Sequence, residues 1–208
     1  MDVINEKSRA VARNRCMEES MKRISLFAIL TLSIVSAGVA FSQEQAIPET
    51  AAPQIGAPPQ MKEISFLVGF WDVAMQVKMA PEAPWMETKA VSTCSLVLDG
   101  CAMQSTFEGD MAGMPMKGIM FTCFNRTTGK WQASWIDNFG AAISLYEGEL
   151  KDGKLIFAGE DKMPQGTMLT RITQFNMTNT KFDWLMENSM DGGKTWFESM
   201  KAVYTKRQ

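Results

Sequence analysis

The stretch Phe66-Leu67-Val68-Gly69-Phe70-Trp71-Asp72 opens a ladder of short alternating segments that ends at Tyr204. Within this ladder apolar and polar residues alternate over short runs, and turn-forming residues, above all glycine, separate the runs. Such a pattern is typical of antiparallel β-strands joined by tight turns. Residues 61–68 are amphipathic and predict one or two helical turns that plug one end of the strand structure. One β-domain is therefore expected over residues 61–208.

Ten short strands are predicted from this alternation and from the turn residues. Asp99-Gly100 predicts a tight hairpin with Cys94 opposite Ser105, because Asp-Gly readily adopts the positive φ angles of such turns. Residues 111–115 predict a looser connection. An open meander has two exposed edges, and closure removes both. We therefore expect an all-β chain folded as a single up-and-down antiparallel barrel of about ten strands. The predicted strands are 70–79, 85–98, 101–109, 116–125, 130–137, 141–150, 154–160, 167–176, 181–190 and 194–205.

Residues 1–42 have the pattern of a secretory signal peptide. An apolar run over residues 24–40 follows two basic residues, and Ala40-Phe41-Ser42 supplies the small residues that favour cleavage before Gln43. The run is shorter than the roughly 20 residues that a membrane-spanning helix needs. We therefore expect cleavage, export to the periplasm or secretion, and no stable membrane insertion afterwards. A start at Met21 would give a more compact leader.

Residues 43–60 are expected to form a disordered linker, because four prolines among alanines and glutamines cannot bury enough apolar surface to fold. Loss of residues 1–42 removes six basic and four acidic residues from the 21 and 23 of the full chain, which leaves a net charge of −4. This modest negative charge offers no basic surface to phosphate backbones. Nucleic acid is therefore excluded as an expected partner.

The chain contains no histidine. This excludes Ser-His-Asp and Cys-His nucleophiles, the usual general base near neutral pH, and an imidazole ligand for haem. Carboxylate pairs on predicted strands remain as candidates for acid–base catalysis, but such rows more often form a solvated outer face. We therefore predict neither an enzyme nor a cofactor, with a carboxylate-based enzyme as the least favoured alternative. The pairs are Glu108 with Asp110, Glu147 with Glu149, and Asp183 with Glu187.

The densest group of aromatic and polar residues is Trp131, Trp135 and Asp137 on one predicted strand with Ser144 and Tyr146 on the next. Trp131 and Trp135 share one face of their strand. Two tryptophans beside a few polar groups suit an apolar ligand with one polar end. The same rings also suit a filled core. The leading hypothesis is non-catalytic binding of a small apolar or amphipathic ligand by Trp131, Trp135, Asp137 and Tyr146.

Met111, Met114 and Met116 form a Met-x-x-Met-x-Met motif in the predicted loose connection. Clustered thioethers can hold copper(I), which favours soft ligands. Periplasmic copper(I) handling is therefore the alternative function. The competing interpretation is that these flexible side chains line the barrel mouth as apolar contacts.

Three cysteines follow the leader. Cys94 and Cys101 lie too far apart along the predicted ladder to form a disulfide. Cys123 is expected beside Cys101 or one register off. The sequence leaves two alternatives open: a Cys101–Cys123 disulfide, which export would permit, or three free thiols.

Several spaced motifs occur in one order along the chain, at residues 66–72, 79–84, 98–100, 109–115, 134–137, 146–148 and 203–205. Together they resemble the bacterial domain-of-unknown-function family 1579, which is similar in fold to the lipocalin and fatty-acid-binding group and has no settled activity. The resemblance implies a short helix at the closed end of the barrel. It also implies structural roles for Gly69 and for Trp71, with the tryptophan covered by Lys206 or Arg207 from the last strand.

Overall fold

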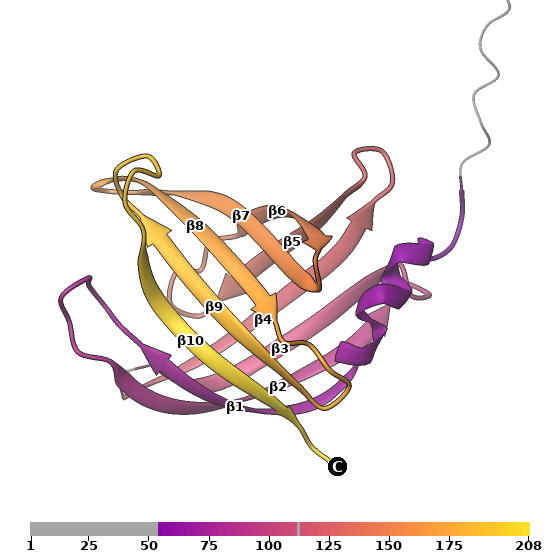
Figure 1. The fold of residues 1–208 in the computed structure, drawn as a ribbon, viewed down its shortest axis with the longest axis horizontal. Coiled ribbons are helices and arrows are strands. Elements are labelled where there is room, and N and C mark those ends of the chain that lie inside the picture. Colours follow the sequence, from indigo (N-terminus) through magenta and orange to yellow (C-terminus); the bar gives the residue numbers. More distant parts are fainter. Residues whose placement is uncertain (1–53, 112) are drawn as a thin grey trace, which may run out of the picture. The chain divides into compact units, whose positions relative to one another are not determined.

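The computed structural model describes residues 54–111 and 113–208. Its strands close into one antiparallel barrel in which successive strands pair and β1 pairs with β10 (Figure 1). The predicted all-β, up-and-down fold is thus confirmed, whereas the predicted leader and most of the predicted linker lie outside the described residues. A 3₁₀ helix, η1 (Pro59–Leu67), precedes the strands β1 (Gly69–Val77), β2 (Met86–Val97), β3 (Ala102–Met111), β4 (Met114–Asn125), β5 (Lys130–Asp137), β6 (Ser144–Lys151), β7 (Lys154–Met163), β8 (Gly166–Phe175), β9 (Lys181–Ser189) and β10 (Phe197–Lys206).

The predicted register of the β2–β3 hairpin is confirmed, and the connection that follows differs from the prediction. Cys94 lies opposite Ser105, and Asp99 has the positive φ of 54° expected in this turn. The loose connection predicted over residues 111–115 is wrong, because Met111 pairs with Met114 and Asp110 with Pro115. The strands β6 and β10 begin three residues later than predicted, and β7 continues to Met163.

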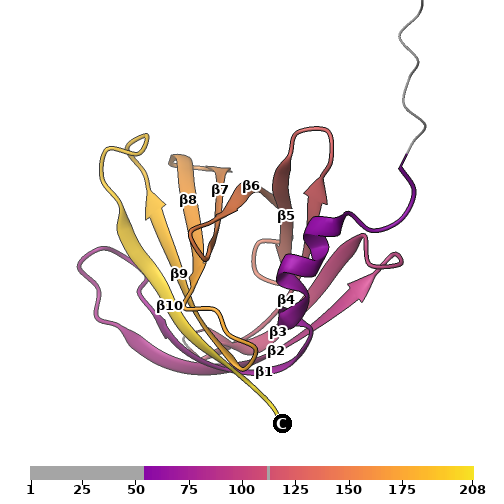
Figure 2. The same cartoon turned by 45° about the vertical axis from the view of Figure 1, so that its right-hand side comes forward.

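Two apolar clusters fill parts of the barrel interior. The first gathers where η1, the start of β1 and the end of β10 meet, which we call the closed end. There η1 inserts Met61, Ile64 and Leu67 among buried strand residues, and Figure 2 shows the helix lying across this end. The second cluster lies toward the opposite, open end and includes Val73 and Met75. No helix of the described residues is long and apolar enough to cross a membrane.

Trp71 is the centre of the closed end. Its ring is fully buried, and its Nε1 donates a hydrogen bond of 2.8 Å to the carbonyl oxygen of Leu67. Phe182 meets the ring edge-on with the centroids 5.0 Å apart. The Nζ atom of Lys206 lies 5.2 Å from the ring centroid and donates a hydrogen bond to the carbonyl oxygen of Phe66. Trp71 thus lies at the closed end, where the resemblance placed it, and Lys206 is the residue that covers it.

Gly69 and Arg207 take different parts in this arrangement. Gly69 has a φ of +140°, and a Cβ atom there would lie 2.6 Å from Cε of Lys206. Glycine therefore lets the lysine pass over Trp71. Arg207, the other predicted cover, instead points to the outer surface and donates two hydrogen bonds to Oδ1 of Asp72.

The cysteines in the described part of the chain are free thiols. Cys123 pairs opposite Ala102, so Cys101 is one residue out of register with it. Neighbouring positions on a strand point to opposite faces, which keeps the two sulfur atoms apart. Of the two alternatives left open by the sequence, the structure therefore contains free thiols and no Cys101–Cys123 disulfide.

Candidate ligand-binding cavity

An internal cavity of about 260 Å³ lies between the two apolar clusters, toward the open end. Each of the ten strands contributes at least one side chain to its wall. Most of the wall is apolar and polarisable, which is the usual character of a small-molecule site, although the volume suits only a small ligand. Seven methionines and five aromatic residues line it: Met75, Met111, Met116, Met120, Met168, Met186, Met200, Phe107, Trp135, Tyr146, Trp184 and Tyr204.

Two aromatic rings of the wall lie over glycines of neighbouring strands. A Cβ atom at Gly118 would lie 2.2 Å from the ring of Trp135, and one at Gly159 would lie 2.6 Å from the ring of Tyr146. The rings occupy the space that larger residues would fill at these two positions. Each ring therefore lies against the barrel wall beside the cavity.

Asp137 fixes the tryptophan and the hairpin that follows it. Its Oδ2 accepts a hydrogen bond of 2.7 Å from Nε1 of Trp135. Its Oδ1 accepts backbone N–H bonds from Phe139 and Gly140, at 2.9 and 2.8 Å. One carboxylate thus orders both the indole ring and the β5–β6 turn.

A second carboxylate, Asp161 on β7, faces the cavity near Tyr146. Its Oδ1 accepts a hydrogen bond of 2.8 Å from Oγ of Ser144. Burial raises the pKa of the Tyr146 phenol, and the charges of Asp161 and Asp137 raise it further. Tyr146 therefore stays a neutral phenol at physiological pH.

The structure brings three of the four predicted ligand residues together. Trp135, Asp137 and Tyr146 line the cavity, but Trp131 does not. Trp131 is buried in the closed-end cluster, where it meets Phe124 edge-on at 5.5 Å between centroids. It shares a face with Trp135 but lies about 13 Å away along β5, so the two tryptophans lie at different depths in the barrel.

Two methionines of the Met-x-x-Met-x-Met motif line the cavity, and the third lies at the rim of the barrel. Met111 and Met116 line the cavity, whereas Met114 is about half exposed at the β3–β4 turn. Met111 and Met114 are cross-strand partners, so their side chains share one side of the hairpin. This placement matches the interpretation of the motif as apolar lining of the barrel mouth.

The carboxylate pairs lie apart from the cavity, and one member of each forms an ion pair on the outer face. Glu108 pairs with Lys117 and Glu147 with Lys130, and all four side chains are about half exposed or more. Glu187 pairs with Arg171 at 2.8 Å. These positions match the solvated outer face that the sequence analysis favoured.

Sequence reasoning missed Asp161, Gly118 and the methionines that come from β8, β9 and β10. Asp161 was missed because β7 was expected to end at residue 160. A glycine inside a strand pattern is itself a signal of close approach by another group, and Gly118 carried that signal. The methionines gave no such signal, because alternation of apolar and polar residues does not distinguish a side chain that lines a cavity from one that packs in a filled core.

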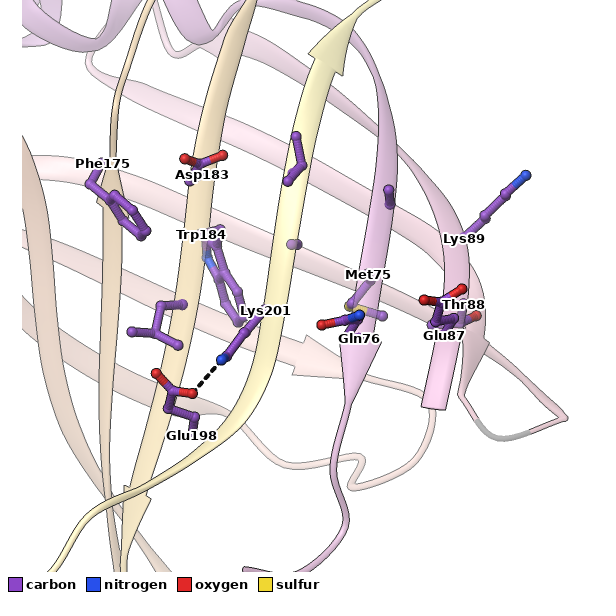
Figure 3. Close-up of a pocket in the computed structure, with 14 residues that line it drawn as sticks. Met75, Gln76, Glu87, Thr88, Lys89, Phe175, Asp183, Trp184, Glu198 and Lys201 are labelled. Carbon is purple, nitrogen blue, oxygen red and sulfur yellow. Dashed lines mark ion pairs between the residues drawn. The ribbon is translucent and has the colours of Figure 1, made fainter. Parts of the chain in front are cut away.

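A larger hollow of about 680 Å³ lies over the outer surface of β1, β2, β9 and β10 (Figure 3). Its rim carries outward side chains such as Gln76 and Lys89, and Lys201 forms an ion pair there with Glu198. Lys201 also lies over the ring of Trp85, with Nζ 4.8 Å from the centroid. Its charged groups lie on the outer face of the barrel, and Lys201 is already paired with Glu198, so we place the candidate site in the smaller interior cavity.

The sequence matches one protein family, described as "Protein of unknown function (DUF1579)", over residues 59–206. No curated protein matches the chain. The crystal structure of Rv2717c from M. tuberculosis is similar, with 11% sequence identity and a TM-score of 0.53 over 73% of this chain and 99% of that one. The S-type phycobiliprotein lyase CPES from Guillardia theta has 11% identity and a TM-score of 0.48 over 71% of this chain and 92% of that one. At this identity the Rv2717c likeness concerns the fold alone.

Proposed function

The chain belongs to this family of unknown function, and from its own cavity we propose that it is a non-catalytic binding protein that holds a small, largely apolar molecule inside the barrel. The observation that carries the proposal is the cavity of about 260 Å³ bordered by Trp135, Tyr146 and seven methionines. An apolar guest there would exchange contact with water for contact with flexible thioethers and aromatic faces. The closed end, by contrast, is filled by the chain's own side chains.

The non-catalytic part of the proposal is supported by how the acidic and phenolic groups are used. Asp137 accepts three hydrogen bonds from its own strand and turn, and Tyr146 has a raised pKa. No group of three or more His, Cys, Asp or Glu that could hold a metal ion occurs in residues 54–111 and 113–208.

The proposal also places the protein outside the cytoplasm, in the periplasm or secreted. Its support is the leader pattern of residues 1–42 in the sequence. Mass spectrometry of the protein from cell fractions tests this part. An N-terminus at Gln43 in the exported fraction supports it, and an uncleaved chain confined to the cytoplasm contradicts it.

Copper(I) handling is the second candidate, because Met111 and Met114 pair across the β3–β4 turn and Met116 follows on the same face of β4. Replacing all three methionines by leucine nearly conserves volume and should leave the fold intact. Loss of copper(I) binding in that variant under reducing conditions would support this candidate. Unchanged binding would remove the motif from consideration.

Tryptophan fluorescence and melting temperature, measured with a panel of small apolar alcohols, test the cavity proposal. Saturable changes in both are expected in the parent protein. Trp135→Phe should reduce the emission change, and Trp184, which also lines the cavity, should account for the remainder. The matched control Trp85→Phe should keep the full change, because Trp85 lies outside the cavity near Lys78 and Lys201. A panel that shifts neither property would overturn the proposal.

A further inference from the structure

The charged side chains that line the cavity are acidic. Among the described residues that line the cavity, the charged ones are Asp137 and Asp161, and both lie toward the open end. Lys206 also faces the barrel interior, but at the closed end, over Trp71 and bonded to the carbonyl oxygen of Phe66. A ligand carboxylate in the cavity would therefore face two carboxylates without a basic partner in the wall.

The two carboxylates differ in how much hydrogen-bonding capacity they have left. An ionised carboxylate offers about four lone-pair sites. Asp137 uses three of them on Trp135, Phe139 and Gly140. Asp161 accepts one hydrogen bond, from Ser144. Asp161 is thus the group with room for a donor from a ligand.

Three hydroxyl groups of the wall are directed at protein acceptors. Ser144 donates to Asp161 as above, and Thr170 donates to Oδ1 of Asn188 at 3.1 Å. Ser105 donates to Sγ of Cys94 at 3.2 Å. These three protons are committed to the protein, and the lone-pair sites that Asp161 has left face the cavity.

From this lining we propose that the ligand carries a positively charged nitrogen, as a protonated amine, whose charge meets Asp161 and Asp137. Its apolar part then lies among the methionines and aromatic rings. The inference rests on the proposed binding function and specifies the class of ligand. The amine donates an N–H bond to Asp161, and such charge-assisted bonds are roughly twice as strong as neutral ones. The faces of Trp135 and Tyr146 beside the carboxylates also attract cations.

Three probes of equal chain length separate the possibilities: 1-octylamine, 1-octanol and octanoate, each titrated into the mature chain at neutral pH by calorimetry. Octylamine should bind about tenfold more tightly than octanol, because its positive charge is attracted to Asp161 and Asp137 and the neutral hydroxyl is not, and octanoate should bind most weakly. Equal binding of octylamine and octanol, or tighter binding of octanoate, would overturn the inference while leaving the binding function intact. If none of the three binds, the proposed function and the inference fall together.

Two neighbouring carboxylates on β7 provide matched variants. Asp161→Asn keeps the shape of the side chain and its bond from Ser144 but removes the charge. Glu160→Gln removes the same charge from the outer face, where Glu160 pairs with Lys162. Asp161→Asn should lose the roughly tenfold preference for octylamine and keep its affinity for octanol, while Glu160→Gln keeps both. An unchanged preference in Asp161→Asn, or an equal loss for all probes, would contradict the inference.

Discussion

The two ends of the barrel use inward-facing tryptophans in different ways. At the closed end Trp71 is fully buried under η1, edge-on to Phe182 and covered by Lys206. Toward the open end Trp135 lies over Gly118 beside a cavity, with its indole N–H on the carboxylate of Asp137. Both residues face the interior, so facing inward does not by itself make a residue part of the core. Whether an inward-facing ring fills the closed end or lines the cavity depends on which residues pack over it.

The open end is ordered by side chains that bond to turn backbones. Asp110 accepts a hydrogen bond from the backbone N–H of Gly113, and Asp137 accepts two from the β5–β6 turn. Asp191 accepts backbone bonds from Lys194 and Thr195 in the β9–β10 connection. Local hydrogen bonds of this kind hold a turn without filling the interior, which leaves the cavity free.

Trp71→Ala should have the largest effect on stability. Removing a fully buried tryptophan costs about 3–5 kcal/mol of unfolding free energy, from the lost transfer free energy and the cavity left behind. Chemical denaturation beside the parent measures this cost. Probe affinity should change little in the protein that stays folded. A loss below about 1 kcal/mol would mean that the closed end does not depend on its plug.

Trp135→Ala should cost less stability, about 1–3 kcal/mol, because one side of the ring borders space rather than packed atoms. It should weaken binding of octanol or octylamine strongly, since the ring forms part of the cavity wall. The same denaturation series, with a titration of each variant, compares it with Trp71→Ala. A stable Trp71→Ala beside an unfolded Trp135→Ala would show that plug and pocket are reversed.

Gly118→Ala tests the position of Trp135 from β4, the strand that pairs with β5. The new Cβ would lie 2.2 Å from the ring of Trp135, so the ring must move toward the cavity. Overpacking usually costs about 1–3 kcal/mol, and the adjacent space should keep the loss near the lower value. Near-ultraviolet circular dichroism should report the displaced indole. Gly140→Ala is the control, because its nearest contact would be an ordinary 3.7 Å, and an identical spectrum for both variants would contradict the placement of Trp135.

Asp191 should give the smallest effect, and one that depends on pH. Hydrogen bonds from the hydroxyl and the backbone N–H of Thr195 lower the pKa of its carboxyl to about 2. Because the folded pKa is below the usual value near 3.9, the stabilisation is present above that value and is lost as pH falls through about 2. The melting temperature of the parent should exceed that of Asp191→Asn near neutral pH, and the gap should close between pH ~4 and ~2. A gap that does not vary with pH would contradict this role for Asp191.

The barrel could be predicted from the sequence because each step depends on local patterns. Alternation located the strands, and Asp99-Gly100 set the register that places Cys94 opposite Ser105. Depth along the barrel could not be predicted, because it depends on which end η1 covers and on the stagger of distant strands. Trp131 and Trp135 therefore looked equivalent although one packs in the closed end and the other lines the cavity. Asp161 was missed because β7 continues to Met163, past the end predicted at residue 160.

The indole N–H signals of the tryptophans in a two-dimensional ¹H–¹⁵N spectrum test the contrast between plug and pocket most directly. Each signal can be assigned with a Trp→Phe variant, and the parent is then titrated with 1-octanol. We predict saturable shifts for Trp135 and Trp184, which line the cavity, and a stationary signal for Trp71, which is buried in the closed end. A shift of Trp71 with Trp135 and Trp184 unmoved, or no shift of any indole, would contradict the account.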